Sequence, residues 1–251
     1  MTLIEIKDLY KAFGQQKVIN GANLTIPDRE VVTIMGKSGS GKSVLIKHIM
    51  GLLSPDSGSV LIDGVDITTL EISELDRIRE KLGVLFQGGA LFDSMTVDEN
   101  VAFQLNEKTK LGKGEISDRV MQALEDVGLK DMGKKYPAEL SGGMKKRAGL
   151  ARALITEPSI LLFDEPTTGL DPIISRSIHR LISTTHEKYR YTAVIISHEV
   201  PGIFEISDKV AMLYNGIIEE CGTPEEIMNS SNPVIKQFIT GSLEGPIESL
   251  A

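Results

Sequence analysis

Apolar and polar residues alternate along the first part of the chain. Residues 4–9 and 18–26 alternate with a period of two, which predicts two antiparallel strands separated by a break at residues 11–14. Residues 58–64 have the pattern of a further hairpin arm. The chain therefore opens with a predicted antiparallel sheet.

Short, mainly apolar runs follow, and they predict buried strands of a different kind. These runs lie at residues 31–35, 83–86, 160–163, 192–197 and 209–214. Helical patterns at residues 44–50, 75–82 and 173–189 lie between them, and an Asn215-Gly216 turn leads into a last strand at 217–221. Strands that alternate with helices are typical of an α/β domain with a parallel sheet.

The stretch from residue 96 to residue 152 is mainly helical in pattern. Thr96 and Glu99 have the spacing of a capping box, residues 116–127 have helical apolar spacing, and residues 108–114 form a polar link. We interpret this stretch as an inserted helical subdomain.

The length of 251 residues and the hydrophobic content of 41% predict one substantial α/β domain, residues 1–251. Its predicted parts are a catalytic core at 1–87 and 160–230, a helical subdomain at 88–159 and a C-terminal tail at 231–251. The apolar stretches are far shorter than the roughly 18 to 20 residues of a membrane span, and the start of the chain has no secretory signal pattern. We therefore expect the protein to stay in the cytoplasm.

The formal net charge of −8 argues against binding to nucleic acid or directly to an anionic membrane surface. The basic run at residues 145–147 lies inside a predicted helix, and we interpret it as a solvated helix face. The single cysteine, Cys221, can form no internal disulfide and is most simply a strand residue.

A glycine-rich segment at residues 36–43 has the strand-loop-helix context of a P-loop. Its glycines allow backbone N–H groups to turn toward an anion at a helix N-terminus. Lys42 is expected to reach the β- and γ-phosphates, and the hydroxyl of Ser43 is the expected Mg²⁺ ligand. Lys37 has no assigned role. The predicted nucleotide ligands are Gly36, Ser38, Gly39, Ser40, Gly41, Lys42, Ser43 and Val44.

Two further segments follow in a fixed order. Residues 140–144 contain Ser141, Gly142 and Gly143, which are expected to open a helix at 144–154 and to form a second anion site with free N–H donors. Residues 160–166 form an apolar strand that ends in Asp164 and Glu165.

The order and spacing of these three segments resemble those of the ATP-binding subunits of ABC transporters, over essentially the whole chain. The resemblance implies an ABC-type P-loop NTPase fold, with a RecA-like core, an antiparallel β subdomain and an inserted helical subdomain. It also implies an ATPase that uses ATP and Mg²⁺.

The resemblance implies roles for single residues as well. Phe13 matches the aromatic that stacks on adenine, with an ordinary core aromatic as the alternative. Gln87 matches the Q-loop glutamine and a metal ligand. Asp164 matches the Mg²⁺-shell carboxylate, and Glu165 matches the general base. The switch histidine and the D-loop aspartate correspond to His198 and Asp171.

A single ATP cannot use both glycine loops of one chain. The resemblance therefore implies a head-to-tail homodimer with two ATP at the interface, in which Ser141, Gly142 and Gly143 meet the nucleotide of the other subunit. It further implies permease subunits that contact the chain near Gln87, which would hold it at the cytoplasmic face of the inner (plasma) membrane.

The segment at residues 86–101, Met144 and the tail from Asn232 to Ile247 are similar to the phospholipid-transport ATPases of the Mla (maintenance of lipid asymmetry) type. This similarity implies phospholipid transport and a periplasm-facing MCE-type lipid-binding chain. Gly88 departs from the serine that is frequent in that group, and Lys37 adds a charge to the P-loop. Two alternatives stay open: the ATPase of a small-solute importer, for amino acids for example, and a non-transport scaffold or mechanical ATPase.

Overall fold

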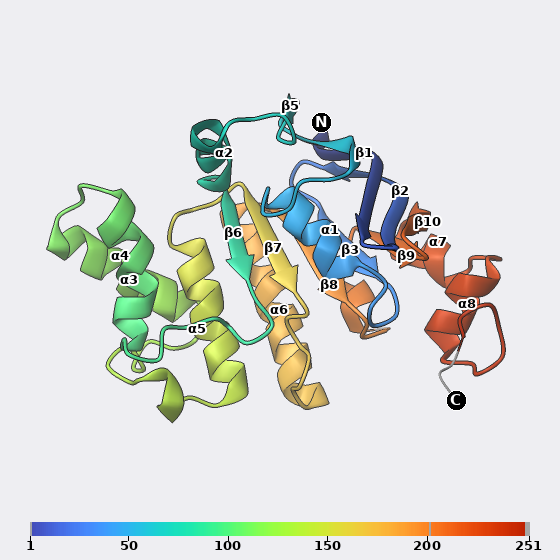
Figure 1. The fold of residues 1–251 in the computed structure, drawn as a ribbon. Coiled ribbons are helices and arrows are strands. Elements are labelled where there is room, and N and C mark those ends of the chain that lie inside the picture. Colours follow the sequence, from blue (N-terminus) through green and yellow to red (C-terminus); the bar gives the residue numbers. More distant parts are fainter. Residues whose placement is uncertain (1, 201, 249–251) are drawn as a thin grey trace. The chain divides into compact units, whose positions relative to one another are not determined.

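The computed structural model describes residues 2–200 and 202–248. Residue 1 of the predicted domain and residues 249–251 of the predicted tail lie outside this range. The chain divides into two compact units, one made of the residues up to Arg79 together with those from Thr192 onward, and the other of Glu80–Tyr191. Each unit is described by itself (Figure 1).

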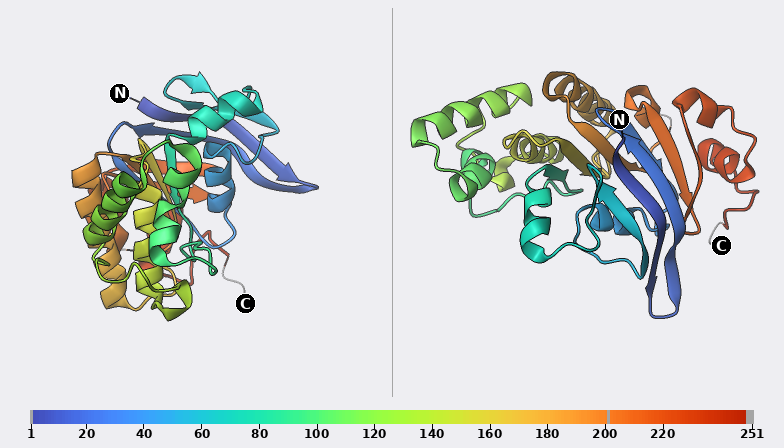
Figure 2. Two further views of the ribbon diagram at one scale, coloured as in Figure 1. Left: turned by 90° about the vertical axis from the view of Figure 1, so that its left-hand side faces the viewer. Right: turned by 90° about the horizontal axis from the view of Figure 1, so that it is seen from above.

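The first unit contains the predicted antiparallel sheet. Its strands are ordered β2-β1-β4-β5, and β1 and β2 form one long hairpin (Figure 2). The predicted break at 11–14 is wrong, because β1 continues to Phe13 and only Gly14 and Gln15 form the turn. Register shifts between β1 and β2 absorb the irregular positions, so the strand continues where its alternation fails. The bounds are β1 Thr2–Phe13, β2 Gln16–Pro27, β4 Ser57–Ile62 and β5 Val65–Asp66.

The same unit contains the strands β3 Val31–Met35, β8 Thr192–Ser197, β9 Lys209–Tyr214 and β10 Ile217–Gly222. β3 pairs in parallel with both β8 and β9, and every residue of β3 and β8 is buried. Burial on both faces explains why these strands have no alternating pattern. The predicted Asn215-Gly216 turn is confirmed, with positive φ at both residues, and it joins β9 to the antiparallel β10.

The helices of this unit are α1 Lys42–Ile49, α2 Ile72–Arg79, α7 Pro224–Met228 and α8 Pro233–Thr240, with a 3₁₀ turn at Gly202–Ile206. The prediction of α2 at 75–82 was displaced toward the C-terminus. The helix begins earlier, where Glu71 and Glu74 form a local hydrogen bond, and it ends before Leu82, which enters a strand. The apolar spacing of so short a segment does not determine at which residue the helix begins or ends.

The second unit is mainly helical around a parallel pair of strands, β6 and β7. α3 and α4 pack against α5, and α5 also contacts β6 and α6. The predicted capping box at Thr96 and Glu99 is confirmed. The bounds are β6 Leu82–Leu85, α3 Val97–Lys108, α4 Lys113–Asp126, a 3₁₀ turn at Pro137–Glu139, α5 Gly142–Leu154, β7 Ile160–Asp164 and α6 Pro172–Tyr189.

A half-buried carboxylate ties α4 to the end of α6. Lys188 Nζ lies 2.6 Å from the Asp126 carboxylate, which also accepts hydrogen bonds from Tyr189 and Gln122. Burial alone would raise the pKa of Asp126, but these donors outweigh it and hold the pKa below its usual value. The two helices are therefore joined by an ionised group.

The loop between β6 and α3 is held from one side by a buried asparagine. Asn100 is 0% exposed, and its side-chain oxygen accepts from Phe92 N at 2.7 Å. Its amide nitrogen donates to the carbonyls of Phe92, Met95 and Thr96 at 2.9 to 3.1 Å. One side chain therefore bonds backbone groups of three residues in the segment 92–96.

We expect Asn100→Ala to lower the free energy of unfolding by about 2 to 4 kcal/mol, because it removes the hydrogen bonds that a fully buried side chain makes to Phe92, Met95 and Thr96. Asn106→Ala on the exposed side of the same helix is the matched control and should change it by less than about 0.5 kcal/mol. Urea unfolding of both variants checks this. Equal losses would show that the Asn100 contacts add nothing to stability.

Candidate functional site

The P-loop runs from the end of β3 to the start of α1, as predicted. Lys42 is the first residue of α1 and is only 4% exposed. Its ammonium donates to Gly36 O at 2.7 Å and to Lys37 O at 2.9 Å, so it binds the loop from inside. Ser38, Gly39 and Ser43 are exposed, and Val44 is half-buried; the side of the loop that contains them is open.

The polar groups of this loop fit an anion. Ser40 Oγ is buried and has no hydrogen-bond partner within the described residues. α1 begins at Gly41 without a side-chain cap, so its first N–H groups are not satisfied by a side chain. A buried hydroxyl and an uncapped helix N-terminus both favour a phosphate at this position.

Gly36 and Gly41 allow close packing of the loop. A Cβ at Gly36 would lie 2.4 Å from the backbone oxygen of Leu213, and one at Gly41 would lie 3.0 Å from that of Val18. Gly41 also has φ of 100°. The loop can therefore lie against β9 and β2 only because these positions have no side chain.

The contact between Gly41 and Val18 brings the β1–β2 hairpin beside the P-loop. Phe13 pairs with Gln16 at the tip of this hairpin, and Gln16 lies two residues before Val18 in β2. Its side chain is 49% exposed, with the ammonium of Lys11 at 5.8 Å from the ring centre. The alternative that Phe13 is a core aromatic is therefore wrong, and its ring is accessible to a ligand.

His198 follows β8 directly. Ser197 at the end of β8 is in register with Met35 at the end of β3. Since the two strands are parallel, His198 and Gly36 leave the sheet at the same edge. His198 is exposed, and this half of the predicted site is brought together within one unit.

In the second unit, the strand β7 ends at the two predicted carboxylates. Asp164 is half-buried, and Glu165 has φ of 51°, in the left-handed region that residues other than glycine rarely adopt. Such a conformation costs about 1 kcal/mol or more and persists where the surroundings fix it. Thr168 Oγ1 donates to Glu165 Oε2 at 3.0 Å, which holds the carboxylate.

Ser141, Gly142 and Gly143 lie at the N-terminus of α5, as predicted. Ser141 is the N-cap and accepts from Met144 N at 3.3 Å, so its hydroxyl oxygen already satisfies one of the helix donors. A Cβ at Gly143 would lie 2.7 Å from Ile174 in α6. The glycines thus let α5 approach the segment that begins α6.

Asp171 has a structural role in the chain itself. It is the N-cap of α6, where its Oδ1 accepts from Ile173 N at 3.0 Å and Ile174 N at 3.1 Å. The side chain of Asp171 is exposed at the N-terminus of α6. In sequence it lies between Leu170 and Ile174, the residues nearest to a Cβ at Gly142 and at Gly143.

Gln87 lies two residues beyond β6 on an exposed part of the loop. Two phenylalanines, Phe86 before Gln87 and Phe92 after it, are 39% and 43% exposed. The loop is held just after Gln87, because Arg152 of α5 donates to Ala90 O at 2.6 Å. Gly89 has φ of 77°, and a Cβ there would lie 2.8 Å from the Lys145 carbonyl.

The basic run at residues 145–147 is not the solvated face that we expected. Lys146 is only 5% exposed and donates to Thr168 O at 2.8 Å, while Arg147 donates to Val127 O at 2.7 Å. Successive helix residues are 100° apart, so three in a row cannot share one solvent face. Neither Lys146 nor Thr168 is among the site residues predicted from the sequence. A signal was present for Lys146, whose spacing from Gly143 and Leu150 places it on the buried side of the helix.

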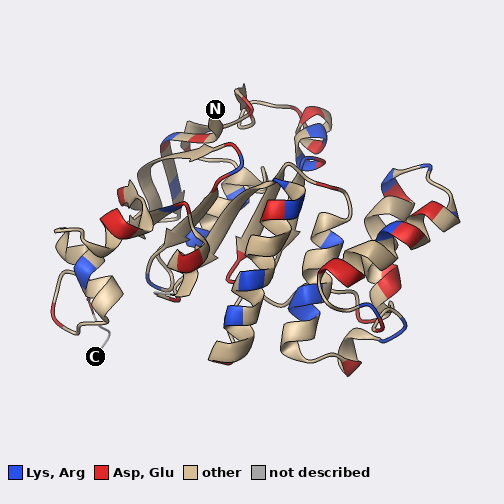
Figure 3. Ribbon diagram, turned by 180° about the vertical axis from the view of Figure 1, so that it is seen from behind, with Lys and Arg blue, Asp and Glu red and all other residues tan. Residues whose placement is uncertain are grey.

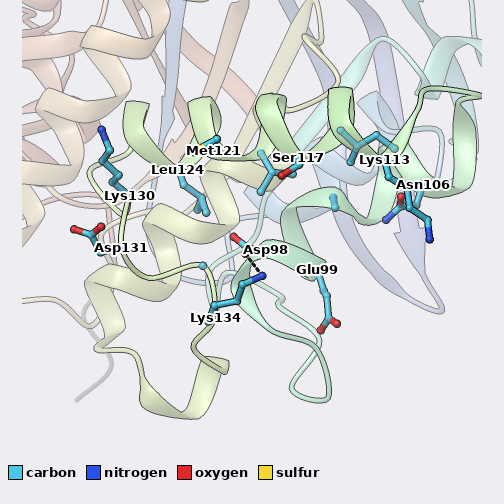
Figure 4. Close-up of a pocket in the computed structure, with 14 residues that line it drawn as sticks. Asp98, Glu99, Asn106, Lys113, Ser117, Met121, Leu124, Lys130, Asp131 and Lys134 are labelled. Carbon is cyan, nitrogen blue, oxygen red and sulfur yellow. Dashed lines mark ion pairs between the residues drawn. The ribbon is translucent and has the colours of Figure 1, made fainter.

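A cavity of about 860 Å³ lies between α3, α4 and the segment that follows α4 (Figure 4). Its rim contains the Asp98–Lys134 ion pair, with 3.1 Å between Nζ and Oδ2. None of the predicted nucleotide ligands lines it. This cavity is therefore separate from the candidate site.

Acidic and basic residues occur on the ribbons of both units (Figure 3). Among residues 2–200 and 202–248, no group of three or more His, Cys, Asp or Glu side chains could hold a metal ion. No helix in that part of the chain is long and apolar enough to cross a membrane.

Comparisons with known proteins agree with this geometry. The family model described as "ABC transporter" matches residues 19–168. The chain is 45% identical to the "Probable ribonucleotide transport ATP-binding protein mkl" of Mycobacterium leprae, over 97% of this chain and 70% of that protein. It is 38% identical to the "Intermembrane phospholipid transport system ATP-binding protein MlaF" of Escherichia coli K12, over 98% of this chain and 91% of that protein.

Among solved structures, the chain is similar to the ATP-binding cassette MJ0796 in a dimeric post-hydrolysis state bound to ADP and Pi. The TM-score is 0.80, with 31% identity over 88% of this chain and 99% of that one. A family match over more than half of the chain and relatives of this identity along nearly its whole length show that the chain belongs to the ABC transporter family, as an ATP-binding and ATP-hydrolysing subunit.

Proposed function

We propose that this ABC ATPase uses Glu165 as its general base and energises the transport of phospholipid between membranes of the cell envelope. The observation that carries the catalytic part is the held carboxylate of Glu165, at the end of β7 and fixed by Thr168. In phosphoryl transfer the protein mainly aligns a water molecule and neutralises charge. A carboxylate held in one position can align the attacking water.

The P-loop residues Gly36 and 38–44 bind the phosphates of ATP through backbone N–H groups and the Ser40 hydroxyl. Lys42 neutralises charge on the β- and γ-phosphates; to do so, its ammonium exchanges carbonyl contacts for phosphate contacts. The exposed ring of Phe13 stacks on the adenine.

The side-chain oxygens of Ser43, Gln87 and Asp164 would hold Mg²⁺, since this ion prefers oxygen ligands. When bound, Mg²⁺ neutralises phosphate charge and orients the γ-phosphate. The N–H groups of Gln87 and His198 donate to the γ-phosphate or the attacking water, and Glu165 accepts the proton of that water.

The dimer is the second part of the proposal. Ser141 and Gly142 are exposed at the start of α5, where the remaining N–H groups and the helix dipole favour an anion. The ATP of a second copy of this chain would supply that anion, with Asp171 close to the same contact. The dimeric state of the similar cassette MJ0796 supports this arrangement.

A membrane permease is the proposed partner at the Gln87 loop, and it would place the chain at the cytoplasmic face of the inner membrane. Phe86 and Phe92 support this, because large exposed apolar side chains on both sides of Gln87 are suited to a protein contact. A periplasm-facing MCE-type chain would complete the assembly. We propose no contact with nucleic acid, in keeping with the net charge of −8.

The relative MlaF supports phospholipid as the cargo, since its name states phospholipid transport and it covers nearly the whole chain. The name of the relative mkl supports a second candidate, transport of a ribonucleotide or another small solute. The two candidates share every catalytic residue and differ in the permease. No observation favours a scaffold without transport.

We expect Lys42→Met to weaken ATP binding by about tenfold to a hundredfold, since it removes a charge-assisted contact to phosphate. Lys47→Met, on the exposed side of the same helix, is the matched control and should bind like the wild type. Titration calorimetry with ATP measures both. Equal affinities would contradict a phosphate-binding role for Lys42.

We expect Glu165→Gln to bind ATP, to form a stable dimer with it, and to lose turnover by about a hundredfold or more, because no base remains to accept the proton of the water. Glu187→Gln on the exposed face of α6 should keep wild-type turnover. Phosphate release and size-exclusion chromatography with ATP measure the two properties. A monomeric or fully active Glu165→Gln protein contradicts the assignment.

The cargo is tested by purifying the chain from its native membranes in mild detergent, identifying the chains that copurify and extracting bound lipid. A small permease, a periplasm-facing lipid-binding chain and phospholipid are the expected result. A solute-importer permease without lipid supports the second candidate. Recovery only in the soluble fraction contradicts both.

A further inference from the structure

The helix α5 has three basic side chains that bind backbone carbonyl groups of other segments. Lys146 binds the carbonyls of Glu165 and Thr168, Arg147 binds that of Val127, and Arg152 binds that of Ala90. Carbonyl groups in a loop lack the regular partners of a helix or sheet, so a cation on a rigid helix can determine where the loop lies. Of the three, Lys146 reaches the segment that contains the proposed general base.

The ammonium of Lys146 binds both ends of one turn. It lies 3.4 Å from Glu165 O and 2.8 Å from Thr168 O, and Thr168 N donates to Glu165 O at 3.3 Å. At 5% exposure the side chain is shielded from water, which strengthens a charge-assisted hydrogen bond. The turn at residues 165–168 is therefore fastened to α5 at its first and last carbonyl.

This turn sets the direction of the Glu165 carboxylate. Glu165 has φ of 51°, a conformation that persists only where neighbouring groups hold it. The hydroxyl of Thr168 donates to Glu165 Oε2 at 3.0 Å, so moving the Thr168 end of the turn moves the carboxylate. Lys146 thus holds the backbone, and Thr168 transmits its position to the reacting group.

Lys146 also lies one helical turn after Gly143. Residues three apart on a helix lie on the same side of it, so the lysine and the glycine at the proposed contact with a second nucleotide belong to one rigid segment. Ser141 and Gly143 contact Met144 N and Ile174 respectively, which fixes the start of that segment. A displacement of the α5 N-terminus therefore reaches Glu165 through one side chain.

We propose that Lys146 is a positioning residue for hydrolysis: its ammonium links the nucleotide-facing start of α5 to the turn that orients the Glu165 carboxylate. This inference rests on the proposed function, because it takes Glu165 as the general base. The carboxylate is aligned when α5 occupies its contact with nucleotide, and the alignment is lost when that contact changes. Lys146 thereby affects the rate of hydrolysis and leaves ATP affinity to the P-loop.

The test compares Lys146→Met, which keeps length and removes the charge, with Lys146→Arg, which keeps the charge. We expect Lys146→Met to lower kcat by about tenfold to a hundredfold, the loss typical of one hydrogen bond to a charged group. Its KM for ATP should stay within about threefold of the wild type. Lys146→Arg should recover most of kcat. Lys145→Met, the half-buried neighbour on the same helix, is the matched control and should turn over like the wild type.

A double-mutant cycle with Glu165→Gln separates positioning from general damage to the fold. If Lys146 acts through Glu165, adding Lys146→Met to Glu165→Gln should lower the single-turnover rate by less than about twofold. The same loss in both backgrounds overturns the inference. Lys146→Gln keeps a neutral donor at the buried position and takes the place of Lys146→Met in the cycle if the methionine variant fails to fold.

The outcomes also separate this inference from the function on which it rests. An active Glu165→Gln protein contradicts the proposed role of Glu165 itself. Wild-type kcat in Lys146→Met, beside an inactive Glu165→Gln, contradicts only the role of Lys146.

Discussion

The loop between β3 and α1 depends on one interaction, the ammonium of Lys42 bound to the carbonyl oxygens of Gly36 and Lys37. N–H groups that the loop presents to a phosphate are not available to hold its shape, although Ser40 N donates to Lys37 O at 3.1 Å. In this structure the lysine holds the loop through its carbonyl acceptors, and in the proposed function these contacts are exchanged for phosphate contacts when ATP binds. The glycines at 36 and 41 then let the fastened loop lie against neighbouring strands.

The second unit uses the same chemistry. Lys146, Arg147 and Arg152 bind the carbonyls of segments that lie far from α5 in sequence, among them the turn with Glu165 and the loop with Gln87. A protein with a net charge of −8 thus has buried or half-buried cations that bind backbone oxygens. Cations on one helix thus hold the turn with Glu165 and the loop with Gln87 in place through backbone atoms.

Much of this arrangement could be predicted from the sequence. The strands β3, β8 and β9 have the predicted bounds, because buried parallel strands are continuous apolar runs with sharp ends. The P-loop has its predicted strand-loop-helix context, and the Thr96 capping box lies where its spacing placed it. Local patterns sufficed there, because an apolar run, a glycine-rich loop before a helix and a capping spacing are each contained in one short segment of the sequence.

The rest depended on partners that are distant in sequence. β1 continues through residues 11–13, where the apolar-polar alternation fails, because β2 pairs with this strand. The sequence of one strand does not reveal its pairing partners. Lys146 was interpreted as solvated because charge is usually exposed, while its carbonyl partners lie 19 and 22 residues away. Asp171 and Ser141 match family positions, yet their side chains also cap helices, a use that the motif does not reveal.

The contacts of Asn100 and Arg152 divide the loop at residues 86–96 into parts of unequal stiffness. From Gly89 onward it is clamped to α3 and α5, whereas Gly88 has open space around it and Gln87 is exposed. Only the three residues 86–88 lie between the end of β6 and the part of the loop that is bound to α3 and α5. A displacement of Phe86 or Gln87 by a partner would therefore be transmitted to α5, because so short a segment cannot absorb it by bending.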